Sequence, residues 1–175
     1  TPTTALGRIN ITDAANPTNT FNLSPVFSVK GKLNLTAPTE PGIVLVYEGE
    51  DSNYSINWTK YGGIQEVQLR YSTDFGNSWP VGKIIESNIN ASNSTYKWYM
   101  PNATGYNLSV KVVDQNDSTV FNTSQNRFAI KGSVHVIYPD GGESLLKGSN
   151  CNLTWKTIGT YAGNVSIQFS NGTGW

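Results

Sequence analysis

The chain has few of the side chains that carry most enzyme and metal chemistry. Its 175 residues include one cysteine, Cys151, and one histidine, His135. Without a second histidine or cysteine, we expect neither a Cys/His zinc site nor a Cys-His dyad. A Ser-His-Asp triad would have to use His135, which lies in an alternating strand pattern, and no Gly-x-Ser-x-Gly elbow accompanies it. The sequence therefore predicts a protein that is not an enzyme, with no catalytic residues and no metal ligands.

Charge and long apolar runs are also scarce. Charged residues make up 14% of the chain, and 12 basic side chains balance 12 acidic ones. Nucleic-acid binding usually requires a basic surface, so we expect no nucleic-acid partner. No apolar run approaches the roughly 20 residues of a membrane helix, and no signal peptide is visible. We therefore expect no membrane insertion in this segment.

Asparagine, by contrast, is abundant: the chain has 20 Asn and 35 Ser plus Thr. Chance would place Ser or Thr two positions after Asn about four times (20 × 35/175), yet 14 such sequons occur without an intervening proline. They begin at Asn10, Asn22, Asn34, Asn53, Asn57, Asn90, Asn93, Asn102, Asn107, Asn116, Asn122, Asn152, Asn164 and Asn171. We expect covalent N-linked glycans there, no other cofactor, and an extracellular or cell-surface location.

Apolar residues recur at a spacing of two in short runs, and no helical period appears. Val67, Leu69 and Tyr71 share one strand face, and Gly, Pro, Asn and Asp bound the runs. This pattern is typical of an all-β chain. We expect strands near 8–12, 26–30, 32–37, 43–47, 54–59, 66–72, 81–85, 96–100, 106–113, 127–131, 134–137, 153–155 and 165–170, with a polar loop at 87–95.

The sequence repeats with a period of 97 to 101 residues. Lys131-Gly132 follows Lys30-Gly31 by 101 residues, and we expect a tight junction between two strands at each pair. Leu153-Thr154-Trp155 follows Ile56-Asn57-Trp58 by 97. This period is the usual size of an immunoglobulin-like β-sandwich, so the predicted fold is all-β, with tandem modules of this kind.

The repeat divides the chain into three parts. Residues 1–31 correspond to the C-terminal strands of a module, 32–131 to a complete module, and 132–175 to the N-terminal half of the next one. Tyr54 occupies the repeat position of Cys151, so a disulfide within one module is not expected. We expect Cys151 to be a small buried residue, with an intermolecular bridge as the alternative.

Six sequons lie in expected strands, beginning at Asn10, Asn34, Asn57, Asn107, Asn152 and Asn164. Residues i and i+2 of a strand share a face. Asn and Ser/Thr should therefore point outward together, while the apolar middle residue points into the core. Glycans would then coat the sheets as well as the loops.

The stretch Pro139-Asp140-Gly141-Gly142-Glu143, followed by Gly148 and Leu153-Thr154-Trp155, resembles a known repeat. Together with the strand 165–170, it is similar to the Kre9/Knh1-type repeats of secreted microbial surface proteins. That resemblance implies tandem Ig-like modules and says nothing about an activity. The complete repeat departs from the pattern at Pro38–Gly42, where Gly-Gly-Glu is expected.

Three other patterns have structural interpretations. Ser72-x-Asp74-x-Gly76-x-x-Trp79 resembles the Asp box of sialidase-type propellers, but it occurs once in full, so we interpret it as a hairpin turn. Trp58, Trp98 and Trp155 lie in apolar alternation and should be core residues. The carboxylates Glu48, Glu50 and Asp51 suit either a solvated turn or a calcium site.

These patterns favour a structural subunit of a glycosylated extracellular filament or surface fibre. Its copies would join head-to-tail by β-strand complementation, or its modules would form one continuous repeat chain. The alternative from another class is an adhesin, or a carbohydrate-binding or spacer module of a cell-surface protein. The expected partners are other copies of the same chain.

Overall fold

The computed structural model describes residues 4–18, 20–160 and 164–174, and nearly all of its regular structure is strand. The elements are β1 (Thr4–Gly7), β2 (Asn10–Thr12), β3 (Phe21–Leu23), β4 (Phe27–Val29), β5 (Lys32–Ala37), β6 (Val44–Tyr47), β7 (Asn53–Tyr61), β8 (Glu66–Ser72), η1 (Val81–Lys83), β9 (Ile84–Asn90), η2 (Ala91–Asn93), β10 (Thr95–Tyr99), β11 (Gly105–Asp114), β12 (Phe121–Thr123), β13 (Phe128–Tyr138) and β14 (Thr154–Ile158). The two η elements are single 3₁₀ turns. The prediction of an all-β, Ig-like chain is confirmed.

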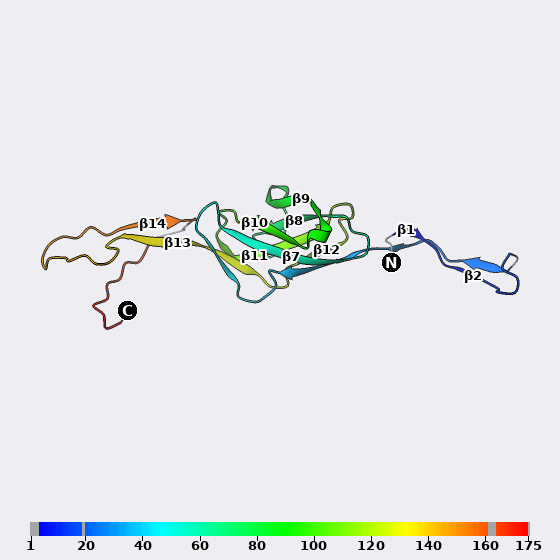
Figure 1. Ribbon diagram of the computed structural model, residues 1–175, viewed down its shortest axis with the longest axis horizontal. Coiled ribbons are helices and arrows are strands. Elements are labelled where there is room, and N and C mark those ends of the chain that lie inside the picture. Colours follow the sequence, from blue (N-terminus) through cyan, green and yellow to red (C-terminus); the bar gives the residue numbers. More distant parts are fainter. Residues whose placement is uncertain (1–3, 19, 161–163, 175) are drawn as a thin grey trace.

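Residues 32–131, called the central module below, form two packed sheets. One sheet has the strand order β10-β7-β5, and the other runs β13-β11-β8-β9, with β12 beside β11 and β6 parallel to β13. Figure 1 shows this module as the thick middle of the molecule, with β1 and β2 at one end and β14 at the other. We call residues 4–31 the N-terminal segment and residues 132–174 the C-terminal segment.

A single apolar core lies between the two sheets. Alternation creates it: Leu33 and Leu35 of β5, and Val67 and Leu69 of β8, are buried while their neighbours face outward. The other buried members are Ile56, Trp58, Ile64, Ile89, Ala91, Trp98, Met100, Leu108, Val110, Val112, Val120, Phe128 and Ile130. Trp58 also satisfies its indole N–H, because Nε1 donates to the carbonyl oxygen of Ala91 at 3.0 Å.

The two Lys-Gly pairs behave differently from each other. Lys30-Gly31 lies between β4 and β5, as expected. The expected break at Lys131-Gly132 is wrong, because β13 runs through this pair as one strand of 11 residues. β13 keeps a ladder partner throughout, pairing first with β11 and β6 and then with β14. A single strand therefore leaves the central module and enters the C-terminal segment without a linker.

Three local predictions are also wrong. Residues 81–85 begin as the 3₁₀ turn η1, and the expected polar loop at 87–95 is largely β9 and η2. Ile89 and Ala91 are buried in the core, and this burial favours regular structure here although most residues of the stretch are polar. Residues 165–170 form no regular structure, because no described strand pairs with them. β12, which pairs with β11, was not expected from the sequence.

The repeat offers a matched test of the core. Trp58 is 1% exposed, whereas its repeat counterpart Trp155 is 39% exposed. Replacing Trp58 with alanine should destabilise the central module by about 3 to 5 kcal/mol, because it removes a large buried ring and leaves a cavity. Trp155→Ala in dilute protein should cost much less. Denaturant unfolding of both variants measures the difference, and equal losses would contradict a core confined to the central module.

Candidate functional site

The N-terminal segment repeats the strand pairing of the central module. β1 pairs with β4 through Thr4↔Val29 and Gly7↔Phe27, with an irregularity between the two pairs. β11 pairs with β13 through Gly105↔Ile130 and Leu108↔Phe128, again with an irregularity between them. Each residue of the first ladder lies 101 positions before its equivalent in the second.

The next hairpin matches as well. β2 pairs with β3 as β11 pairs with β12, with Ile11↔Asn22 corresponding to Val112↔Asn122. A hydrogen bond from a backbone N–H to a serine hydroxyl is repeated too. The hydroxyl of Ser24 accepts from the backbone N–H of Ile9 at 2.9 Å, as that of Ser124 accepts from Val110 at 3.0 Å. The described part of the N-terminal segment therefore holds the conformation of a module's last strands.

The C-terminal segment repeats the opposite half. In β5 and β7, Leu33 pairs with Lys60 and Leu35 with Trp58; in β13 and β14, Val134 pairs with Thr157 and Val136 with Trp155. Both ladders have a bulge directly after the second of these pairs, between Leu35 and Ala37 and between Val136 and Tyr138. The same hairpin is thus built at both places, although among the described residues a second sheet covers only the first.

Most residues whose counterparts are buried in the central module are exposed in these two segments, and Val29 is half-buried. Ile11 is 72% exposed, whereas its counterpart Val112 is fully buried. We define the N-terminal face as Ile9, Ile11, Phe27 and Val29, the counterparts of Val110, Val112, Phe128 and Ile130. The C-terminal face comprises Val134, Val136, Leu153, Trp155, Val165 and Ile167, the counterparts of Leu33, Leu35, Ile56, Trp58, Val67 and Leu69. The two faces represent the two sides of one sandwich core.

The C-terminal face borders an apolar hollow of about 630 Å³. Val134, Val136 and Trp155 line it from the hairpin, and Val165 and Ile167 line it from the irregular stretch that follows. In the central module, the equivalent space is filled by Val110, Val112, Phe128 and Ile130. The hollow is therefore the uncovered half of a core.

A side-chain hydrogen bond joins β12 of one sheet of the central module to β5 of the other. The side-chain oxygen Oδ1 of Asn122 on β12 accepts from the backbone N–H of Leu35 on β5 at 2.9 Å. The repeat counterparts of these residues are Asn22 and Val136. Asn22 is exposed in the N-terminal segment, and Val136 lies in the C-terminal segment. The chain therefore carries the acceptor and the donor of a second such contact, one in each segment.

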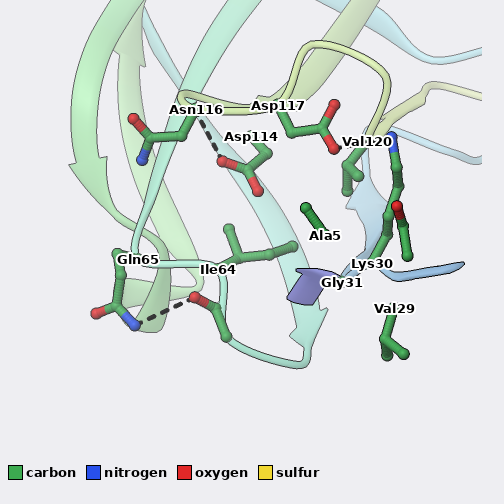
Figure 2. A pocket seen from close by; sticks show the side chains of 12 residues that line it. Ala5, Val29, Lys30, Gly31, Ile64, Gln65, Asp114, Asn116, Asp117 and Val120 are labelled. Carbon is green, nitrogen blue, oxygen red and sulfur yellow. Dashed lines mark hydrogen bonds and ion pairs between the residues drawn. The ribbon is translucent and has the colours of Figure 1, made fainter. Parts of the chain in front are cut away.

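A second hollow, of about 430 Å³, lies where the N-terminal segment meets the central module (Figure 2). Lys30 bridges the two parts, because its ammonium lies 3.0 Å from a carboxylate oxygen of Asp117 and also bonds to Thr119. Gly31 passes so close to Ile64 that an added Cβ would lie 2.5 Å from its side chain. Among the described residues, the contacts at this junction therefore include the Lys30–Asp117 ion pair, the Lys30–Thr119 hydrogen bond and the close approach of Gly31 to Ile64.

The structure places the sequon asparagines mainly at the surface. Those that are exposed are Asn10, Asn22, Asn34, Asn53, Asn90, Asn93, Asn102, Asn107, Asn116, Asn152, Asn164 and Asn171. Asn57 and Asn122 are half-buried. Asn57 accepts from the hydroxyl of Thr95, and Asn122 carries the contact to Leu35 described above.

The expected outward pairing of Asn with Ser/Thr holds in only part of the chain. Leu35, Trp58 and Leu108 are buried middle residues, as expected, but Ser109 is also buried, where it bonds to Ser124 at 2.8 Å. For the other three strand sequons, the prediction that the middle residue points into the core is wrong, because Ile11, Leu153 and Val165 are exposed. They lie in the two segments whose cores are uncovered.

The structure also places the other residues that the sequence analysis considered, among them His135, Cys151 and Trp155. His135 is exposed on β13, with Nε2 lying 3.2 Å from the hydroxyl of Ser133. Cys151 is a free, half-buried thiol rather than a fully buried one. Trp155 is not the core residue that its alternation predicted. In the described part of the chain, no three His, Cys, Asp or Glu side chains come close enough to hold a metal ion, including Glu48 and Asp51.

The Asp-box sequence forms a tight turn after β8. One carboxylate oxygen of Asp74 accepts from the backbone N–H of Ser78 at 3.0 Å, and the hydroxyl of Ser72 accepts from Gly76 N–H at 2.9 Å. Gly76 has φ +79°, and an added Cβ would lie 3.1 Å from the ring of Trp79. Only glycine meets both demands without strain, so the motif works here as a structural turn.

No protein-family model and no curated protein matches the chain. Among solved structures, the fibronectin(III)-like modules of CbhA from Clostridium thermocellum align with 20% identity and a TM-score of 0.36. The alignment covers 73% of this chain and 64% of that chain, which is less than two thirds of the neighbour's length. Separately, within the described residues no helix is both long and apolar enough to span a membrane.

Two aspartates should make stability fall in acid. Hydrogen bonds from the Ser72 and Ser78 side chains lower the pKa of Asp74 to about 2, and those from Thr119 and Lys30 lower that of Asp117 to about 2. Both values lie below the ordinary 3.8, so this stability is present above about pH 3.8 and is lost as pH falls toward 2. Denaturant midpoints measured from pH 5 to pH 2 should therefore decline.

The matched variant Asp74→Asn/Asp117→Asn should lower stability near neutral pH and flatten this decline, because neither amide takes up a proton. A variant whose midpoint falls as steeply as that of the wild-type protein would show that other groups control the acid response.

Glycan occupancy should follow exposure. A glycan on Asn122 would have to leave from between β12 and β5 and would disturb the bond to Leu35, whereas Asn34 projects freely from β5. Peptide mass spectrometry of native glycoprotein should find Asn34 occupied more often than Asn122. Full occupancy at Asn122, with its bond to Leu35 intact, would contradict this prediction.

Proposed function

We propose that this chain is a non-catalytic structural subunit of an N-glycosylated extracellular filament. Its copies join head-to-tail, so that the N-terminal segment of one copy completes the C-terminal segment of the next. The observation that carries the proposal is that one chain has two exposed apolar faces. Each face repeats one half of the central module's core. A protein in water does not normally leave faces of this kind uncovered.

The geometry of the two faces favours a filament over a closed dimer. They are different surfaces at opposite ends of an elongated molecule (Figure 1). Contact between two different surfaces is heterologous, and it extends indefinitely unless the rotation between copies closes a ring. The strand β13, which continues from the central module into the C-terminal segment, would transmit the direction of one module to the next without a flexible linker.

The sequons support an extracellular location. Exposed sequon asparagines are spread over strands and loops of all three parts of the chain, from Asn10 to Asn171. Glycans at the exposed sequons that lie outside the joint between copies would coat the filament and, as bulky solubilising groups, would oppose lateral association of its sheets. The resemblance to Kre9/Knh1-type surface repeats agrees with this setting.

A second candidate function is carbohydrate binding. A hollow of about 250 Å³ on the central module is lined by the aromatic residues Tyr71, Tyr96, Trp98 and Tyr99. Tyr99 is 55% exposed, and the hydroxyl of Tyr96 donates to Glu86 at 3.3 Å. Aromatic faces beside polar groups can stack against sugar rings, so this hollow favours an adhesin or carbohydrate-binding module. Binding on a glycan array that Tyr99→Ala abolishes would support it.

Electron microscopy of purified native material tests the filament proposal. We expect long fibres with an axial repeat that fits sandwich modules and a surrounding layer of glycan.

Deleting residues 1–31 should leave soluble particles, because the donor strands are removed while the core of the central module remains. Isolated particles of the wild-type protein would contradict the proposal and favour the carbohydrate-binding alternative. Fibres that persist after the deletion would show that another contact joins the copies.

A further inference from the structure

We propose that the N-terminal segment of a second copy binds the C-terminal face in one defined register, the register that β11 and β13 have in the central module. This inference rests on the proposed function, and it specifies which residues meet. The repeat offsets determine the pairing, because the same ladder is already formed once within each chain.

The first part of the interface is a new β-ladder. In the central module, β11 pairs with β8 through Val110↔Tyr71, Lys111↔Arg70 and Val112↔Leu69. Subtracting 101 from the first residue and adding 98 to the second gives the pairs between copies. These are Ile9↔Phe169, Asn10↔Gln168 and Ile11↔Ile167. Residues 165–170, which form no regular structure in a single chain, would become a strand on binding.

The second part of the interface is the apolar core. Ile9, Ile11, Phe27 and Val29 would take the places that Val110, Val112, Phe128 and Ile130 have in the central module. Those four residues are at most 2% exposed there. The hollow of about 630 Å³ beside the C-terminal face is the space that these side chains would enter. Burial of exposed apolar surface supplies the driving force.

A polar contact would fix the register. In the central module, Asn122 accepts from the N–H of Leu35 at the bulge of β5. Its counterpart Asn22 would accept from the N–H of Val136, which lies at the equivalent bulge of β13. A slip of one residue would turn the apolar face outward and also break this bond. One register is therefore strongly preferred.

Cysteine cross-linking of the full chain tests the register. Asn10→Cys and Gln168→Cys are introduced singly into a Cys151→Ser background, and the two proteins are mixed in a glutathione redox buffer. Asn10 and Gln168 would be directly opposite each other, within reach of a disulfide. The control mixes Asn10→Cys with Thr173→Cys, whose position lies five residues away, at roughly 3.3 Å per residue. Mass spectrometry identifies the linked peptides.

We expect the Asn10–Gln168 disulfide to form at least tenfold more than the control disulfide. Adding Ile11→Asp to the Asn10→Cys protein should abolish the difference, because an unpaired carboxylate would enter the hollow, whereas Ile11→Val should preserve it. Since Ile11 is exposed in the single chain, neither substitution alters the core of the central module.

The outcomes separate this inference from the proposed function. Fibres in the microscope together with equal yields of the two disulfides would overturn the register and leave the filament standing. Equal yields without fibres would overturn both. Preferential Asn10–Gln168 linkage that Ile11→Asp does not reduce would overturn the assignment of Ile11 to the hollow.

Discussion

An apolar sheet face in water must be covered, and the rest of this structure follows from that constraint. In the central module, the sheet containing Leu35 and Trp58 is covered by the sheet containing Val110 and Phe128. Neither sheet would keep its side chains dry without the other, since each strand alternates between an inner and an outer face. The two ends of the chain repeat these sheets separately, so each has an apolar face and no cover within the described chain.

The N-terminal and C-terminal segments show how much of a module forms without its core. Hairpin pairing, a repeated bulge and the Ser24 contact to Ile9 all persist when Ile11 and Val136 are exposed. Local backbone pairing is thus encoded within each half. Residues 165–170 mark the limit, because a strand without a ladder partner has nowhere to direct its N–H and C=O groups except water.

The connection between modules has mechanical consequences. β13 crosses from the central module to the C-terminal segment as one strand, and Lys30 ties the other junction to Asp117 and Thr119. Gly31 allows the close approach to Ile64 on which that junction depends. Under the proposed function, these connections would set the direction of each module relative to the next.

The sequence by itself determined the all-β fold, most strands of the central module and the repeat, because alternation and a period near 100 residues are local or co-linear properties. It also located every sequon, since the motif is purely sequential. Only the tertiary structure decided which apolar residues are buried. Trp58 and Trp155 have the same pattern, yet one lies in a core and the other does not, because burial depends on the sheet opposite and not on the strand itself. The continuity of β13 and the contact of Asn122 with Leu35 likewise depend on neighbours far away in the chain, which no local pattern contains.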